Sequence, residues 1–432
     1  MDSRRSPIPR SRKLPELADL DLSDPEFWGR PPAEREAVFA ALRAEQLFAF
    51  FAEPELPFIE TGAGYYAVVR HGDIDTISSA PTVFCSGQGA VSIPDLPAEL
   101  VEFYGSLISM DDPRHGKIRR IVSRAFSPRL LGDLVDSVEV LAAQIVTRAR
   151  AVADAGDGTF DFVREIAAPL PLAVICQMMG IPEADRPLVL AKSTAILSGG
   201  DPEMGSPEEV FGLILEAGSA LAELIGRLAA ERAVHPTDDL TSALVTTEID
   251  GEHLSVQEIA SFFILLCVAG NETTRNAITH GLCALQAFPD QRARWLADPS
   301  LTRTAVEEIV RWASPVTWMR RTATQDVVVA GQQFLAGDKF VLFYNSANRD
   351  ETVFADADTF DLGRDPNPHY GFGASGPHFC LGANLARREI AVAFATLFEL
   401  MPDLVVVGEP DRLRSSFVNG IKHLTVRLTG RT

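Results

Sequence analysis

The sequence lacks a long apolar run, an excess of positive charge and a signal-like start. Its longest apolar stretch, Ile259 to Gly270, has 12 residues, which is too few to span a bilayer. Basic residues number 39 against 59 acidic ones, a net charge of −20, and this argues against a nucleic-acid-binding protein. Prolines rather than an apolar segment follow Arg4 and Arg5, so no signal peptide is expected. We expect a soluble, cytoplasmic protein without a transmembrane segment.

The five cysteines are scattered and show no C-x-x-C spacing. This argues against a disulfide scaffold or a structural zinc site and is typical of a reducing compartment. Cys380 differs from the other four because glycines surround it and a strongly helical run follows.

The chain of 432 residues is 46% hydrophobic, which is enough for a sizeable core. Residues 1–18 are rich in Pro, Arg and Ser without periodicity, and we predict a flexible tail there. No linker or internal repeat divides residues 19–432, so we predict a single domain. Helical periodicity dominates from about residue 113 to 290. Strand-like runs occur at 64–70, 326–330, 339–344, 404–407 and 424–428. The fold class predicted is mainly α with small β-sheets.

The first motif places Cys380 between a glycine-rich segment and a helix. Three glycines precede it from residue 371 on, and Gly382 follows. A cysteine at a helix N-terminus lies at the positive end of the helix dipole, which lowers its pKa and favours the thiolate. Glycines let the backbone approach a large flat ligand. A thiolate held in this way is a known axial ligand of haem iron. The alternative is a glycine-rich turn with an incidental cysteine.

The second motif interrupts an apolar helix. A capping box at Ser255–Glu258 predicts the start of the helix, which then changes abruptly at Ala269, Gly270, Glu272 and Thr273. Small residues, an acid and a hydroxyl in a buried helix are unfavourable unless they line a cavity. They fit an oxygen pocket with a proton relay. The alternative is a polar helix end in solvent, but apolar periodicity resumes further along, so we favour the cavity.

The third motif is a pair of opposite charges, Glu308 and Arg311, at positions i and i+3 of a predicted helix. Such a pair is usually a surface feature. Arg364 could complete a triad that holds the irregular segment leading to the Cys380 loop.

The fourth motif is a basic cluster between Pro113 and Gly132, where no acidic residue occurs. His115 and Arg119, at i and i+4, could reach one buried anion. The remaining basic residues could form a docking face for an acidic partner, and a solvated helix face is the alternative. The basic residues are Arg114, Lys117, Arg119, Arg120, Arg124 and Arg129.

In this order and at these separations, the motifs resemble those of cytochrome P-450s, the cysteine-ligated haem monooxygenases. The resemblance extends from about Pro32 to Leu428. The stretches IASFFILLCVAGNETTRNAITHG, TAVEEIVRWASPV, SANRDE and FCLGANLARREI are similar to bacterial members that hydroxylate methyl-branched lipids, terpenoids and cholesterol side chains. The similarity is greatest to the methyl-branched-lipid ω-hydroxylase group.

The resemblance implies a mainly helical fold of triangular outline that binds haem b, with Cys380 as the iron ligand. Thr273 and Glu272 are then expected to deliver protons beside Ala269 and Gly270. The residues expected to hold the haem and its propionates are His115, Arg119, Arg321, Phe372, His378 and Gly382. Glu308, Arg311 and Arg364 are expected to form the structural triad. Two departures stand out: Phe372 lies eight residues before Cys380 rather than seven, with Gly373 at the seventh position, and Glu272 replaces a more frequent Asp.

The implied reaction inserts one atom of O₂ into a C–H bond, with electrons from a ferredoxin or flavodoxin and its reductase. We expect an apolar, methyl-branched substrate oxidised near a chain end. A sterol or a compact terpenoid is the alternative substrate, and a peroxide-driven enzyme or a haem-binding sensor is the alternative function. Pocket residues expected from family placement are Ile93, Leu197, Val316, Trp318 and Phe417.

Overall fold

The computed structural model describes residues 20–45, 48–56, 59–125, 128–197, 205–248 and 251–430, without the side chains of 124–136, 197 and 207. The helices are α1 Pro25–Gly29, α2 Pro32–Glu45, α3 His71–Ser78, α4 Ala98–Gly105, α5 Arg114–Ala125, α6 Pro128–Ala155, α7 Pro169–Met179, α8 Arg186–Leu197, α9 Pro207–Val234, α10 Leu240–Thr246, α11 Val256–Ala287, α12 Pro289–Ala297, α13 Thr302–Ala313, α14 Tyr344–Ala347 and α15 Ala383–Leu400. The predicted tail at 1–18 lies outside the described residues.

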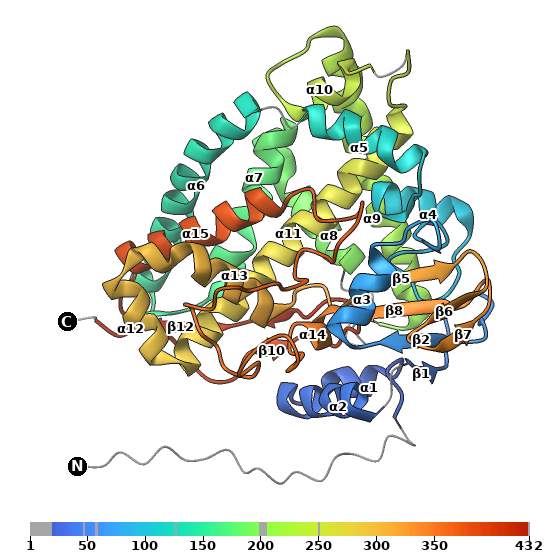
Figure 1. The fold of residues 1–432 in the computed structure, drawn as a ribbon. Helices are drawn as coiled ribbons and strands as arrows, with labels where there is room; N and C mark the ends of the chain where they lie inside the picture. The colour runs from blue at the N-terminus through green and yellow to red at the C-terminus, as the bar shows by residue number, and fades with distance from the viewer. Residues whose placement is uncertain are drawn as a thin grey trace, which may run out of the picture.

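The strands are short and form small sheets. They are β1 Phe48–Phe51, β2 Tyr65–Val68, β3 Phe84–Cys85, β4 Thr159–Asp161, β5 Trp318–Ala323, β6 Val327–Val329, β7 Gln332–Phe334, β8 Lys339–Phe343, β9 Leu404–Val406, β10 Asp411–Arg412, β11 Ile421–His423 and β12 Thr425–Leu428. The largest sheet has the order β1-β2-β8-β5-β3. The prediction of a mainly α fold with small sheets is confirmed. Figure 1 shows the triangular outline, with α11 crossing the middle of the molecule.

Helix α11 organises the helical part of the structure. The Ser255 side chain accepts the Glu258 N–H at 3.1 Å, and the Glu258 carboxylate accepts the Ser255 N–H at 2.8 Å, so the predicted capping box is present. Most residues of α11 are buried, and the helix packs against α7, α9, α13 and α15. Because the helix passes through the core, its break at 269–273 lies inside the protein.

The two faces of the largest sheet have different neighbours, because successive side chains of a strand point to opposite faces. Trp318 and Arg320 of β5 lie on the same face of the sheet as Phe343 of β8. On this face, residues of the sheet pack with those of α1 and α2 in an aromatic core. Met319 and Arg321 point to the other face. This alternation decides which residues of β5 reach the cavity described below.

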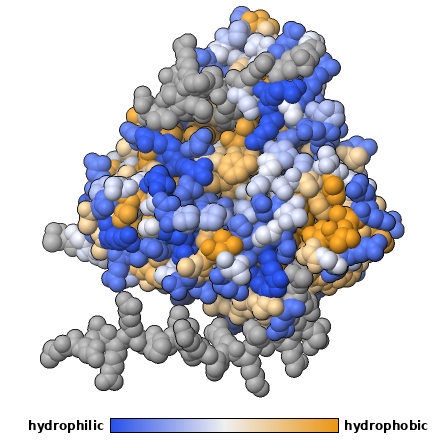
Figure 2. All heavy atoms as spheres, viewed as in Figure 1, coloured by the Kyte–Doolittle hydropathy of each residue, from blue (hydrophilic) through white to orange (hydrophobic). Residues whose placement is uncertain are grey.

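In the part of the chain that the structure describes, no helix is both long and apolar enough to cross a membrane. Figure 2 shows polar side chains over most of the visible face, with an apolar area on the side of the β6–β7 hairpin. Val328 of β6 and Leu335 just after β7 are among the exposed apolar side chains of the protein.

Candidate active site

The loop that carries Cys380 is held by backbone hydrogen bonds and by glycines. The Cys380 N–H donates to the Phe372 carbonyl at 3.0 Å. Gly376 has a φ of +123°, and a Cβ there would lie 2.5 Å from the Ser78 carbonyl oxygen, so a glycine is required. The loop ends where α15 begins, and it presents the Cys380 side chain to a cavity.

This cavity lies between α11 and the Cys380 loop and holds about 1500 Å³ of empty space, part of it open to solvent. Gly270 allows α7 to approach α11, because a Cβ at this position would lie 2.9 Å from the Cδ1 atom of Ile175. The structure thus brings residues more than 100 positions apart around one space. The predicted residues that line it are Arg119, Ala269, Gly270, Thr273, Val316, Arg321, Phe372, His378, Cys380 and Gly382.

A positively charged corner occupies one side of the cavity. The rings of His115 and His378 are 4.2 Å apart, and the side chains of Arg119 and Arg321 lie near them. Burial and the neighbouring positive groups lower the pKa of His378 to about 3. The buried Nε2 atom of His115 has no hydrogen-bond partner. Among the described residues, the nearest carboxylate contact of this corner is Asp112, 3.8 Å from His115 Nδ1. The corner therefore suits an anionic ligand.

The thiol, the corner and the glycine-lined space together fit an iron porphyrin. Cys380 offers a soft sulfur ligand, which suits haem iron. The orphaned nitrogen of His115 and the two arginines offer donors for carboxylate groups. A Cβ at Gly382 would meet nothing within 4 Å, so the backbone leaves open space beside the sulfur.

The direction of the Cys380 pKa differs from the sequence-based expectation. Burial raises the pKa of the thiol, and this outweighs the Gly382 N–H, Arg119 and Arg387, which lower it. Desolvation of the thiol thus opposes the effect of the helix start on its pKa. Coordination to a metal ion deprotonates a thiol directly, so a ligand role for Cys380 would not depend on the helix dipole.

The two residues of the predicted relay lie on different sides of α11. Thr273 lines the cavity, and its hydroxyl donates to the Ala269 carbonyl at 2.6 Å. Glu272 is fully buried, does not line the cavity and pairs with Arg275 one turn along. Burial raises the pKa of Glu272, while Arg275 lowers it. Neighbouring residues of a helix point about 100° apart, which separates the two side chains.

A second buried carboxyl group was not predicted. Glu389 of α15 lines the cavity and hydrogen-bonds to Thr274, the residue after Thr273. Burial raises its pKa to about 8, although the Thr274 hydroxyl lowers it. The residue lies within FCLGANLARREI, but an acid among charged residues of a helix looks like a surface group. Only packing shows that this position is buried.

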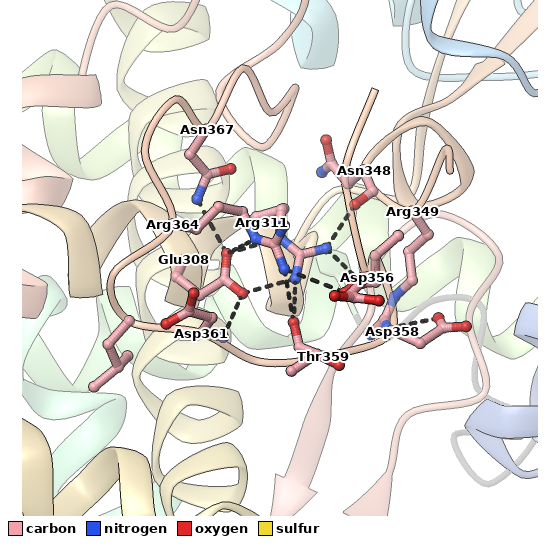
Figure 3. Close-up of polar contacts among 12 residues, drawn as sticks. Glu308, Arg311, Asn348, Arg349, Asp356, Asp358, Thr359, Asp361, Arg364 and Asn367 are labelled. Atoms are coloured by element: carbon pink, nitrogen blue, oxygen red, sulfur yellow. Dashed lines mark hydrogen bonds and ion pairs between the residues drawn. The ribbon is translucent and has the colours of Figure 1, made fainter. Parts of the chain in front are cut away.

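The structure brings the predicted triad together in a network whose centre, Glu308 and Arg311, is fully buried (Figure 3). The Glu308 carboxylate and the Arg311 guanidinium form two hydrogen bonds, at 2.7 and 2.8 Å. Arg364 donates to the same carboxylate at 3.2 Å. Arg311 also donates to the carbonyls of Asn348 and Ala357, at 2.8 and 2.9 Å. The network therefore ties α13 to the irregular segment 348–367.

The structure separates the pocket residues that were expected together. Val316 lines the cavity, whereas Ile93, Trp318 and Phe417 pack in the aromatic core on the other face of the sheet. Strand alternation is the reason for Trp318, because its neighbour Met319 takes the place at the cavity. The side chain of Leu197 lies outside the described residues.

The basic cluster is already partly neutralised within the protein. Arg114 contacts an acidic residue of α4 at 2.7 Å, and Lys117 pairs with Glu252. A third member turns inward to the corner described above. The side chains of Arg124 and Arg129 lie outside the described residues.

Comparison with known proteins gives consistent results. The cytochrome P450 family profile matches residues 220–403. The methyl-branched lipid omega-hydroxylase of Mycobacterium tuberculosis is 49% identical over 411 residues, 95% of each chain. The steroid C26-monooxygenase of Mycolicibacterium smegmatis is 41% identical over 372 residues, 85% of this chain and 84% of the relative.

A solved structure, Mycobacterium marinum cytochrome P450 CYP268A2 in complex with pseudoionone, has 42% sequence identity and a TM-score of 0.89. The match covers 97% of this chain and all of that one. These findings confirm the resemblance drawn from the motifs and agree with the thiol-lined cavity. The chain therefore belongs to the cytochrome P450 family and is a monooxygenase, in a family whose cofactor is a haem with a cysteine thiolate ligand.

Proposed function

We propose that the protein hydroxylates a methyl-branched lipid or isoprenoid near a chain terminus. The observation that carries the proposal is the apolar wall of the cavity opposite Cys380. Among the described residues, the charged side chains that line the cavity are Glu389 and the two arginines of the positive corner. The remaining lining is mostly apolar, which favours a hydrocarbon chain as the ligand. The apolar wall includes Leu107, Ile108, Ile175, Phe262, Leu266 and Val316.

The names of the relatives support the same substrate class. One group of relatives is named for methyl-branched lipids and is 49% identical, and a second group is named for steroids and is 41% identical or less. We therefore place a methyl-branched lipid first. A sterol side chain is the second candidate, because those relatives match as much as 99% of the chain.

Haem b held by Cys380, with its propionates at His115, Arg119, Arg321 and His378, would supply the activation of O₂. One oxygen atom enters the C–H bond, and the other leaves as water with two protons and two electrons. The apolar wall orients the lipid chain and excludes bulk water. The Thr273 hydroxyl donates its hydrogen to the Ala269 carbonyl of its own helix. Its oxygen is therefore free to accept a hydrogen bond from a donor in the cavity. Glu272 would exchange protons with this region through a change of its Arg275 pairing.

The electron donor that we propose is a ferredoxin, or a flavodoxin, with its reductase. An acidic carrier would dock at the basic residues of α5, in the cytoplasm. Arg120→Glu should slow reduction by a ferredoxin and weaken the dependence of the rate on salt. An unchanged rate and salt dependence would remove α5 from the docking surface.

Two measurements test the function in sequence. The reduced protein with carbon monoxide should show a strongly red-shifted Soret band, which Cys380→Ser should abolish. Branched lipids should then shift the spectrum and yield terminally hydroxylated products with a surrogate ferredoxin and reductase. Tight binding of sterols with no response to branched lipids would reverse the order of the two candidates. Turnover with peroxide alone would favour a peroxide-driven enzyme, and haem binding without turnover would favour a sensor.

A further inference from the structure

One segment, residues 86–111, joins β3 to α5 and forms part of the cavity wall. Its two ends are tied together, because the Asp111 carboxylate accepts the N–H groups of Ser86 and Gly87, each at 2.8 Å. Leu107 and Ile108, near its end, line the cavity. The position of this segment therefore helps to determine the shape of the space above Cys380.

A buried arginine of the sheet holds the middle of the segment. Arg320 donates to the Asp95 carboxylate at 2.6 Å and to the Ile93 carbonyl at 2.9 Å. It also lies 3.3 Å from the Ser92 carbonyl. Its backbone N–H donates to the Ala90 carbonyl at 2.8 Å. One residue thus contacts three backbone carbonyls between residues 90 and 93 and one carboxylate.

Lys339 of β8 completes this network, which we call the sheet clamp: Glu53, Asp95, Arg320 and Lys339. Its ammonium group lies 2.6 Å from Glu53 and 2.9 Å from the second oxygen of Asp95. Arg320, Lys339 and Glu53 are buried, but the Asp95 side chain is 60% exposed. If the segment moved away with Asp95, Arg320 would stay buried without its carboxylate. The clamp therefore favours the position in which the segment lies against the sheet.

Arg320 acts at a distance from the haem site. It points to the face of the sheet opposite its neighbour Arg321, which lines the cavity. In the described structure, the Arg320 side chain donates to residues 92–95 and to Thr322, which do not line the cavity. Its backbone carbonyl accepts a hydrogen bond from the Arg321 side chain at 2.8 Å, and a substitution of the Arg320 side chain leaves this carbonyl in place. Its influence on the cavity passes through the 86–111 segment.

We propose that Arg320 is a positioning residue for substrate selectivity. Through the sheet clamp it fixes the 86–111 segment over the cavity, and so it sets which lipid chains fit beside Cys380. The proposal rests on the function proposed above, since the ligands concerned are apolar chains. In this proposal, the neighbouring Arg321 contacts the haem propionates and Arg320 does not.

The test compares ligand binding to the haem-loaded variants Arg320→Met and Asp95→Asn with the wild type. Spectral titrations with phytol, unbranched hexadecanol and cholesterol measure the substrate selectivity. Imidazole is the control, because this small ligand does not depend on the position of the 86–111 segment. We expect the Kd of the best lipid to rise about tenfold in Arg320→Met, with less preference between chains and little change for imidazole. Arg320→Lys should restore part of the preference.

A matched control separates positioning from general destabilisation. Arg43 of α2 is also buried, with 6% exposure, and pairs with the 59% exposed Glu351 at 3.0 Å. Its other partner is Ser346 of α14, so it does not hold the 86–111 segment. Arg43→Met should lower stability while leaving the lipid Kd ratios unchanged. Faster amide hydrogen exchange across 87–97 is expected in Arg320→Met and not in Arg43→Met.

The outcomes are distinct. Equal changes of lipid Kd in Arg320→Met and Arg43→Met, or no change in Asp95→Asn, would overturn the proposal. If the wild type binds cholesterol but neither phytol nor hexadecanol, the proposed substrate order fails, and the clamp is then judged from the cholesterol Kd. If Arg320→Met does not fold, Asp95→Asn and the exchange rates of 87–97 decide.

Discussion

Two buried charge networks in this protein differ in how far their most exposed member reaches solvent. In the triad, Glu308 and Arg311 have no exposed side-chain surface, and Arg364 has 10%. In the sheet clamp, the partner of Arg320 is an exposed aspartate on a connecting segment. The triad thus belongs to the fixed part of the fold, whereas the clamp attaches a separable segment.

The physical difference lies in what happens when a partner leaves. A buried ion that loses its partner keeps the full penalty of desolvation. An exposed ion is rehydrated, so only one side of the pair is left unsatisfied. The first arrangement suits the segment 348–367 beside the Cys380 loop. The second arrangement, with one exposed partner, suits the 86–111 segment, which we propose to determine substrate selectivity.

Breaking the triad should have the largest effect on stability. Arg311→Met removes the paired cation of the buried Glu308 carboxylate, which keeps Arg364 and two neutral donors. It also removes the donors to the Asn348 and Ala357 carbonyls. We expect a loss of about 3–5 kcal/mol in the free energy of unfolding. Chemical unfolding of the haem-loaded protein measures this loss. Arg311→Lys, which keeps the charge but not the paired geometry, should recover little of it. A loss below about 1 kcal/mol would show that the network is dispensable.

Glu389 is a third buried acidic residue to compare with these networks, and its side chain hydrogen-bonds to the hydroxyl of Thr274. Its pKa is raised from 4.5 to about 8, so the folded protein holds a proton that the unfolded chain releases. The contribution to stability is therefore complete below pH 4.5 and is lost as the pH rises through 8. Compared with the wild type, Glu389→Gln should gain up to about 1.4 kcal/mol per pH unit within this window. A constant difference between pH 5 and pH 8 would contradict the raised pKa.

Asp95→Asn tests the exposed end of the clamp by its stability alone. The amide can still accept a hydrogen bond from Arg320 but loses the charge shared with Lys339. Because Asp95 is 60% exposed, we expect a loss of about 1 kcal/mol, well below that of Arg311→Met. Thermal unfolding of the two variants side by side measures the difference. Equal losses would remove the distinction between the two networks.

A surface pair gives the lower limit of the series. Glu223 and Arg227 of α9 lie 3.0 Å apart at positions i and i+4, and their side chains are 76% and 60% exposed. Glu223→Ala should change the free energy of unfolding by no more than about 0.5 kcal/mol. A larger loss, measured under the same conditions, would mean that exposure is a poor guide to the other three effects.

Much of the site could be predicted because its signals are local. The glycines around Cys380, the break at 269–273 in α11 and the Glu308–Arg311 spacing lie within single elements. The structure then brought Cys380, Gly270, Thr273 and Arg321 to one cavity.

Other features depend on contacts between distant residues and were not predicted. The Arg320–Asp95 pair spans 225 positions, and no local pattern connects its members. Which of Trp318 and Met319 points to the cavity depends on the orientation of β5 relative to it. The raised pKa values of Cys380 and Glu389 result from desolvation, which depends on residues that the fold brings near them.

The sequence by itself indicated the family and a candidate iron ligand, Cys380, because these rest on residue types at short spacing. Tertiary structure alone decided which residues face the cavity, where Glu272 points and which distant charges form pairs. Desolvation and long-range pairing depend on where the whole chain places a group, and a residue's own neighbours in sequence do not specify that place.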